Sequence, residues 1–239
     1  NPDNRYVPIQ PKAEMDSIVL GSAIALPVGT VFMNANARDK AKYVVNEFGN
    51  IELTAEKKEF NSLMLGLESN IEKNIRFSDD ALKTALLYSR IGNYIDFAAL
   101  SKVDRNTILN LIHRENKDPL DPVEYGHLKE DLSQAARLVY ITDNCGEIVL
   151  DKLVIKVLKS YYPDLDITVI VRGFPVVNDA TMKDALETGL ADVVTVIGNG
   201  SDAPGTWLPG ISKEARKCIE DGVKPEDFRR PGHMFPLVA

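Results

Sequence analysis

The sequence is poor in cysteine, histidine and tryptophan, and it lacks a long uninterrupted hydrophobic run. Its 239 residues include only two cysteines, Cys145 and Cys218, which are too few for a disulfide framework. The most apolar stretch, residues 17–33, contains Pro27 and two glycines. It is shorter than the roughly 20 apolar residues of a membrane-spanning helix, and acidic residues rather than a basic cluster precede it. We therefore expect a cytoplasmic protein with no membrane partner.

Positive charge is also in short supply. Lys and Arg number 28 against 35 Asp and Glu, which gives a formal net charge of −7. Because binding to nucleic acid requires a basic surface that neutralises phosphates, this balance argues against a general nucleic-acid binder. Hydrophobic residues make up 44% of the chain and charged residues 26%, which is ordinary for a globular protein with a substantial core.

The middle of the chain has the apolar spacing of helices. Residues 54–75 carry apolar side chains at helical spacing, and residues 78–93 open with Ser78 and two acids, a typical helix start. Two shorter helices are predicted at 105–116 and 121–138. These patterns predict a helical lobe over residues 54–136, while residues 1–53 remain unassigned.

From residue 137 onward, strands and helices alternate. The strands are expected at 137–142, 166–173 and 191–200, and the helices at 146–163, 178–189 and 212–222. The strands are rich in Val and Ile and apolar on both faces, which favours a parallel sheet covered by helices. Residues 137–239 are therefore predicted to form a metal- and phosphate-binding α/β domain, for the reasons that follow. It would be a three-layer α/β/α, Rossmann-like parallel sheet, preceded by the N-terminal helical lobe.

Polar side chains follow each predicted strand. They are Asp143, Asn144 and Cys145 after the first, Arg172, Asn178 and Asp179 after the second, and Ser201 and Asp202 after the third. Right-handed crossovers bring these loops to one edge of the sheet, where ligands bind in such folds. Carboxylate and amide oxygens suit Mg²⁺ or Mn²⁺, and loop glycines and helix starts bring N–H groups toward an anion. The pattern predicts a site for a metal and a phosphate.

Each of these residues also has a structural alternative. Asp, Asn and Ser after a strand commonly cap the following helix. Cys145 at a helix start has the position of an activated nucleophile, but a packing role is the better interpretation because no histidine lies nearby in sequence. Arg172 is equally suited to clamping a phosphate and to pairing with an acid.

Three segments resemble the domain of unknown function 89 family, the metal-dependent damage-control phosphatases. They are "ITDNCGEIVLDKL", "VRGFPVVNDATMKDA" and "VIGNGSDAPGT", and the stretch from "EFNSLMLGLE" to "YSRIGNYIDFAAL" is similar to the family's helical lobe. The likeness covers about residues 58–222. It implies an α/β/α fold and a divalent cation (Mn²⁺, Ni²⁺, Co²⁺ or Mg²⁺) used to hydrolyse small phosphorylated metabolites such as sugar phosphates.

The resemblance also implies roles for particular residues. Asp143, Asn144 and Asp179 would bind the metal, and Asp143 and Asp179 would be catalytic. Substrate binding would fall to Asn93, Asp96, Arg172, Asn178, Ser201 and Asp202. This hypothesis requires Asp143 and Asp179 to lie together. If they lay on opposite rims, or if an ion pair buried either carboxylate, the enzymatic hypothesis would fail and only the fold assignment would remain.

Two departures keep other functions open. The family's Lys-Gly-Gln-Gly-Asn motif has no counterpart in this sequence, which leaves a catalytically impaired protein that binds metal and phosphometabolite as an alternative. The tail at 224–239 resembles a segment of 3,4-dihydroxy-2-butanone-4-phosphate synthase. That activity is the third and weakest hypothesis, because a tail of this length cannot build the active site.

Overall fold

The computed structural model describes residues 17–21, 54–94, 120–176, 178–201, 206 and 208–221. The strands are β1 (Ser17–Gly21), β2 (Arg137–Ile141), β3 (Asp166–Val171) and β4 (Thr195–Gly198). The helices are α2 (Thr54–Arg76), α3 (Ala81–Tyr94), α5 (Pro122–Gln134), α6 (Glu147–Tyr161), α7 (Met182–Glu187) and α8 (Lys213–Glu220), with a short 3-10 helix at Leu208–Gly210. The predicted helix at 105–116 and the tail at 224–239 lie outside the described residues.

The four strands form one parallel sheet in the order β1-β2-β3-β4. The predicted α/β fold is thus confirmed, with one strand more than the sequence indicated. The additional strand, β1, lies in the segment left unassigned, because a short apolar run of this kind does not distinguish a buried strand from a buried loop. β4 begins at Thr195 rather than Ala191, since residues 191–194 form turns.

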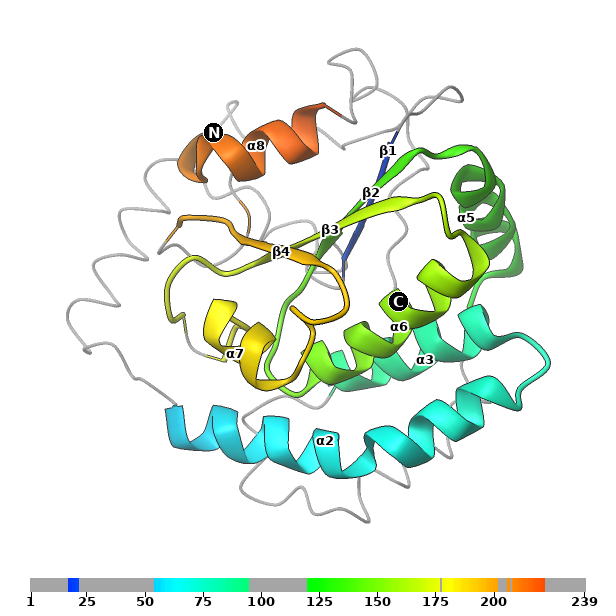
Figure 1. Cartoon of the computed structure of the whole chain (residues 1–239), viewed down its shortest axis with the longest axis horizontal. Helices are drawn as coiled ribbons and strands as arrows, with labels where there is room; N and C mark the ends of the chain where they lie inside the picture. The colour runs from blue at the N-terminus through cyan, green and yellow to red at the C-terminus, as the bar shows by residue number, and fades with distance from the viewer. Residues whose placement is uncertain are drawn as a thin grey trace, which may run out of the picture.

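Alternate residues of β2 face different helices. Leu138 and Tyr140 of β2 belong to the large core shared with α2, α3 and α6. Val139 and Ile141 belong to a smaller core with Ala215 and Ile219 of α8. Figure 1 shows α8 on one side of the sheet and α6, α3 and α2 on the other. Both faces of β2 are covered, as expected for a strand of a parallel sheet that is apolar on both sides.

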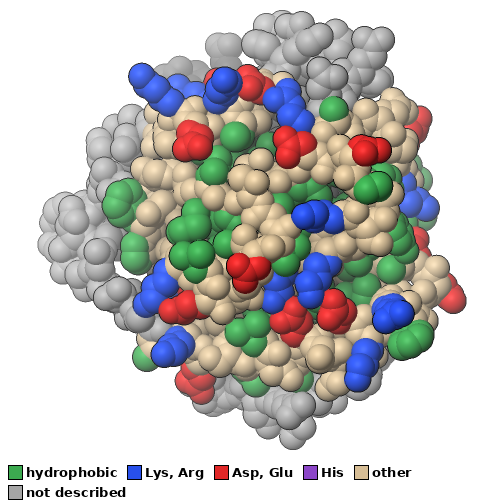
Figure 2. All heavy atoms as spheres, in the orientation of Figure 1, with side chains coloured by type: hydrophobic (Ala, Val, Ile, Leu, Met, Phe, Trp, Pro, Cys, Tyr) green, Lys and Arg blue, Asp and Glu red, His purple; other side chains and the backbone are tan. Residues whose placement is uncertain are grey.

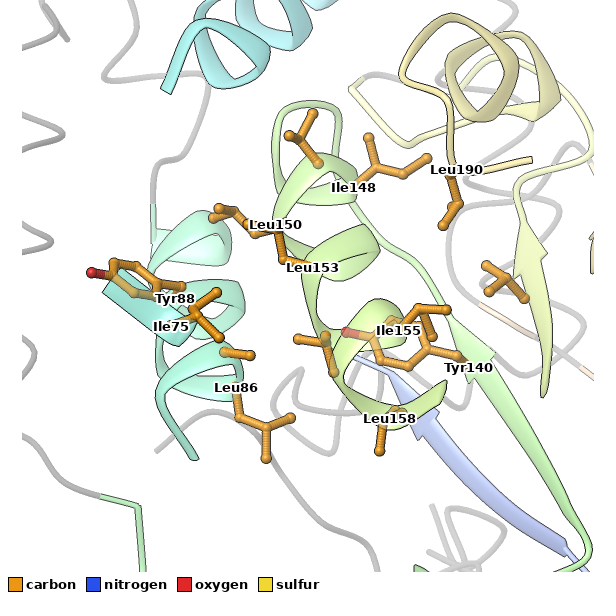
Figure 3. Packing of buried hydrophobic residues seen from close by; sticks show 14 of the residues in the cluster. Ile75, Leu86, Tyr88, Tyr140, Ile148, Leu150, Leu153, Ile155, Leu158 and Leu190 are labelled. Carbon is orange, nitrogen blue, oxygen red and sulfur yellow. The ribbon is translucent and has the colours of Figure 1, made fainter. Parts of the chain in front are cut away.

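The helices of the predicted lobe pack directly against the α/β part. Leu86 of α3 and Leu150 and Leu153 of α6 lie between these two helices (Figure 3), and α2 contributes Ile75 to the same core. α2 and α3 therefore act as a helical layer over α6. The domain boundary near residue 136 stays a prediction.

The surface carries both signs of charge. Figure 2 shows Lys and Arg side chains beside Asp and Glu side chains over the described part of one face. Lys156, for example, has its Nζ atom 3.5 Å from Oε1 of Glu68 and 3.0 Å from Oε1 of Glu72. Within the described residues, no helix combines the length and apolarity needed to cross a membrane. The cytoplasmic location stays a prediction.

Candidate metal site

The loops after β2 and β3 are joined by a short antiparallel bridge between Asn144 and Asp179. The Ala180 N–H donates to the Asp143 carbonyl at 2.7 Å, and the Cys145 N–H donates to the Asn178 carbonyl at 2.8 Å. These bonds flank the bridge, so Asn144 and Asp179 form a non-hydrogen-bonded pair, the kind in which opposing side chains lie closest. The backbone thus brings two of the three predicted metal ligands side by side.

Asp143, the third predicted ligand, precedes this bridge and is buried. The pKa of its carboxyl is raised to about 6, first by burial and then by the negative charge of nearby Asp179, while Arg172 and a hydrogen bond from Asn144 oppose the shift. Because the Asp143 carbonyl accepts from the residue that follows Asp179, the two aspartates are neighbours across the two loops. The structure therefore brings Asp143, Asn144 and Asp179 to the same edge of the sheet, as the sequence predicted.

Asp179 is held by Arg172. The guanidinium Nε and Nη2 atoms lie 2.6 Å and 2.5 Å from the same carboxylate oxygen, Oδ2. Burial nevertheless raises the pKa of Asp179, because desolvation outweighs the attraction of Arg172. An ion pair of the kind that would count against the site is thus present at Asp179, although its side chain keeps 13% of its surface exposed and is not fully buried. Arg172, expected to line a substrate pocket, is itself 5% exposed and serves in this structure to hold Asp179.

Neither aspartate caps a helix. α6 starts from Gly146, which has no side chain to cap with and a φ of 79°. α7 starts from Thr181, which bonds to Asp184, and α8 starts from Ser212, whose Oγ accepts from the Ala215 N–H at 3.1 Å. The capping alternative is therefore wrong for Asp143 and Asp179.

The expectation about free N–H groups at the loop glycines is also wrong for two of them. The Gly146 N–H donates to Oδ1 of Asn61 at 2.7 Å. The Gly173 N–H donates to Oδ1 of Asn199 at 2.8 Å, and the same oxygen accepts from the Ser201 N–H at 2.9 Å. Side-chain amides within the protein therefore occupy donors that an anion would need.

α2 contributes polar residues that the sequence interpretation missed. Asn61 donates through Nδ2 to Oδ1 of Asp184 at 3.0 Å, and Lys57 has its Nζ atom 3.0 Å from Oδ2 of the same carboxylate. With its bond from Gly146, Asn61 connects the loop after β2 to the first turn of α7. Both residues are buried and lie on the apolar stripe of Phe60 and Met64. Two polar residues at core positions of a helix were the signal available in the sequence.

The structure describes the side chains of some of the remaining predicted site residues and not of others. Asn178 donates through Nδ2 to Oδ1 of Asn144 at 2.8 Å, and Ser201 is buried in the loop after β4. Asn93 lies in the last turn of α3, where only the backbone is described, while Asp96 and Asp202 lie outside the described residues.

Two further observations limit the chemistry of this edge. Cys145 is fully buried, and burial raises the pKa of its thiol, which fits a packing role rather than a nucleophile. In the described part of the chain, no three His, Cys, Asp or Glu side chains form a cluster that could hold a metal ion. The candidate therefore depends on two carboxylates and one amide oxygen.

A parallel α/β domain with acids and amides at the carboxyl edge of its sheet defines a broad class of ligand-binding proteins. The particular family follows from comparison with known proteins. Residues 41–222 match the family described as "Damage-control phosphatase ARMT1-like domain". The match covers more than half of the chain, and the protein belongs to this family. The resemblance noted from the sequence is thereby confirmed.

Three archaeal proteins are similar to this chain. The chain is 32% identical over 146 residues to a protein of Archaeoglobus fulgidus named damage-control phosphatase, a match that covers 60% of this chain and 49% of that protein. It is 30% identical over 125 residues to a damage-control phosphatase of Pyrococcus horikoshii, covering 52% and 42%. An uncharacterized protein of Methanocaldococcus jannaschii is 34% identical over 151 residues, covering 59% and 46%. The chain thus spans about half the length of the curated relatives it matches.

A solved structure and a short match complete the comparison. The crystal structure of a DUF89 family protein from Pyrococcus horikoshii superposes with a TM-score of 0.63 over 84% of this chain and 77% of the other, at 19% identity. At this identity the likeness supports the fold alone. The riboflavin biosynthesis protein RibBA of Staphylococcus epidermidis is 54% identical over 28 residues, 12% of this chain and 7% of that protein. A match of that length supports no synthase activity.

Proposed function

We propose that this chain hydrolyses small phosphorylated metabolites, sugar phosphates among them, with a divalent cation bound by Asp143, Asn144 and Asp179. The observation that carries the proposal is the bridge that pairs Asn144 with Asp179 beside Asp143 at the edge of the sheet. Membership of the damage-control phosphatase family supports it.

The chemistry of the three side chains fits a divalent cation. Carboxylate and amide oxygens are hard ligands of the kind that Mg²⁺ and Mn²⁺ prefer. The negative charge of Asp179 raises the pKa of buried Asp143, and a cation between the two carboxylates would offset this repulsion. The same donors accommodate Ni²⁺ or Co²⁺, so the choice of metal is left to the experiment below.

Each residue has a distinct task in this proposal. When bound, the cation would supply positive charge that stabilises the phosphoryl group during transfer. Arg172 holds Oδ2 of Asp179, which leaves Oδ1 as the oxygen that would join Asp143 in binding the cation. Asn178 holds the amide of Asn144. Contacts of the substrate with Asn93, Asp96, Arg172, Asn178, Ser201 and Asp202 stay predictions.

One observation favours a second function, binding of a metal and a phosphometabolite without turnover. The ion pair of Asp179 with Arg172 occupies one oxygen of a predicted catalytic carboxylate and the guanidinium predicted to bind substrate. A protein of this kind would be stabilised by sugar phosphates in the presence of metal, yet would release no phosphate.

The test is phosphate release from a panel of small phosphate esters with Mn²⁺, Ni²⁺, Co²⁺ or Mg²⁺ added in turn. We expect metal-stimulated release by the wild type and a loss of at least about 100-fold in Asp143→Ala and in Asp179→Ala, the size expected when transition-state charge stabilisation is removed. The control is Asp166→Ala, an exposed acid at the opposite end of β3, which should stay within about twofold of the wild type.

Two outcomes would contradict the proposed hydrolysis. Equal release by the wild type and both site variants would show that the carboxylates are not involved. Metal-dependent thermal stabilisation by sugar phosphates without any release would instead support the binding function.

A further inference from the structure

Glu147 makes an unusual double contact with a predicted metal ligand. It is the first residue of α6 and is fully buried. Its Oε2 atom accepts from the backbone N–H of Asn144 at 3.3 Å and from the Nδ2 of the same residue at 3.1 Å. One carboxylate oxygen therefore holds both the main chain and the side chain of Asn144.

This double contact determines which way the Asn144 amide points. A backbone N–H can only donate, so Oε2 is an acceptor, and the amide group that faces an acceptor must be its NH₂. The carbonyl oxygen Oδ1 then lies on the other side, where Asn178 donates to it at 2.8 Å. Because the O and N atoms of an amide are nearly equal in size, such hydrogen bonds decide their placement.

We propose that Glu147 is a positioning residue that fixes the orientation of the Asn144 amide and so determines where its oxygen is available to a cation. The inference rests on the proposed function, because it assigns Asn144 Oδ1 as a ligand beside Asp179. Glu147 does not touch the cation in this scheme. It acts through Asn144, as the outer hydrogen-bonding partners of metal ligands commonly do.

Stabilisation of a helix start is the competing explanation for the same contact. Asp184 provides the comparison, because its Oδ2 accepts from the N–H of Thr181 at 2.8 Å and from the Thr181 hydroxyl at 2.7 Å, in the same i to i+3 arrangement. A hydroxyl rotates freely and both donates and accepts, so this contact selects no orientation. An amide has distinct ends, and only the contact at Asn144 has a consequence for ligation.

The substitution Asn144→Asp separates the two explanations. Asp is as suitable a ligand for Mn²⁺ as Asn, so a metal site that needed only oxygen at this position would keep its affinity. A carboxylate at position 144 has no hydrogen to donate, however, and would face the carboxylate of Glu147. Adding Glu147→Gln supplies an NH₂ group to face it, but the backbone N–H of residue 144 then loses its acceptor, so the restoration is partial.

The experiment is isothermal titration with Mn²⁺ alone, together with the melting temperature of each variant without metal. We expect Asn144→Asp and Glu147→Ala to bind Mn²⁺ about 10- to 100-fold more weakly, and the double variant Asn144→Asp/Glu147→Gln to bind it at least about threefold more tightly than Asn144→Asp. The control is Ser212→Ala, which removes the cap of α8 and should lower the melting temperature without changing Mn²⁺ affinity.

The outcomes distinguish this inference from the proposed function. If the wild type binds Mn²⁺ and Asn144→Asp binds it equally well, or the double variant shows no recovery, Glu147 does not position the ligand and only the inference fails. If the folded wild type binds no Mn²⁺, the proposed metal site and the inference both fail. Should Glu147→Ala not fold, the single and double variants at position 144 decide the question.

Discussion

Two buried acids of the same β2–α6 segment, Asp143 and Asp151, differ in what surrounds them. Asp143 lies at the end of β2, beside Asp179 and the guanidinium of Arg172. Asp151 lies within α6, where its Oδ1 accepts from the Tyr140 hydroxyl at 2.6 Å and from the Ser89 hydroxyl at 2.7 Å. The partners of Asp151 are thus neutral side chains inside the core.

The two acids nevertheless have similar proton affinities. Burial is the largest cause in both cases and raises the pKa of Asp143 to about 6 and that of Asp151 to about 7. A raised pKa is often used to find catalytic residues, but structural networks shift pKa values as well. What separates the two acids is position, since only Asp143 lies at the carboxyl edge of the sheet with other candidate ligands.

The largest expected effect is a contrast in activity. Asp143→Asn should lower metal-stimulated phosphate release by at least about 100-fold, because the amide removes a charged ligand of the proposed site. Asp151→Asn keeps an oxygen to accept from Tyr140 and Ser89, and its activity should stay within about threefold of the wild type. Similar losses in both variants, measured by initial rates, would show that the comparison is wrong.

The second-largest expected effect is on stability, and it comes from the loop after β2 that contains Gly146. A Cβ atom at Gly146 would lie 2.1 Å from Cδ1 of Phe60, on a backbone with a φ of 79°. Gly146→Ala should therefore lower the free energy of unfolding by about 2–4 kcal/mol, measured by urea denaturation. In Gly66→Ala, where the helical site is open, stability should rise by up to about 1 kcal/mol. Equal stability of the two variants would show that the loop adapts without strain.

The smallest effect is the pH dependence caused by Asp151. Its pKa is about 7 in the folded protein and about 4 in an unfolded chain, so the native state binds the extra proton. Its contribution to stability is present below about pH 4 and is lost as the pH rises through 7. Between pH 5 and pH 8, the free energy of unfolding of the wild type should fall by at least about 1 kcal/mol more than that of Asp151→Asn.

The control for this measurement is Asp164→Asn, an exposed acid in the turn after α6. It should keep the pH dependence of the wild type. A pH profile of Asp151→Asn that coincides with that of the wild type would show that Asp151 is ionised in the folded protein at neutral pH.

Much of the fold was accessible from the sequence because apolar periodicity is strong where the core is large. α6 and β3 lie within two residues of the predicted bounds, since nearly every turn of α6 and both faces of β3 are buried. The edge that gathers Asp143, Asn144 and Asp179 followed from the rule for parallel strands. The sequence signal was weak for β1, which has only five residues and no flanking pattern.

The contacts that connect the loops were harder to predict, because they join residues far apart in the chain. Asn61 reaches Gly146 across 85 positions, and Lys57 reaches Asp184 from the first turns of α2. Arg172 was equally suited to a phosphate and to an acid in the sequence, and in the structure it binds Asp179 seven residues away. Polar side chains of one type suit a ligand and a protein partner equally well, and only their placement in three dimensions tells the two roles apart.

The central claim is that Asp143, Asn144 and Asp179 bind one cation, and a crystal soaked in Mn²⁺ tests it most directly. The account predicts an anomalous peak within about 2.5 Å of an oxygen from each of the three side chains. An anomalous peak at any other place would contradict the claim. So would the absence of a peak at this edge in saturating Mn²⁺, with Arg172 still paired to Asp179.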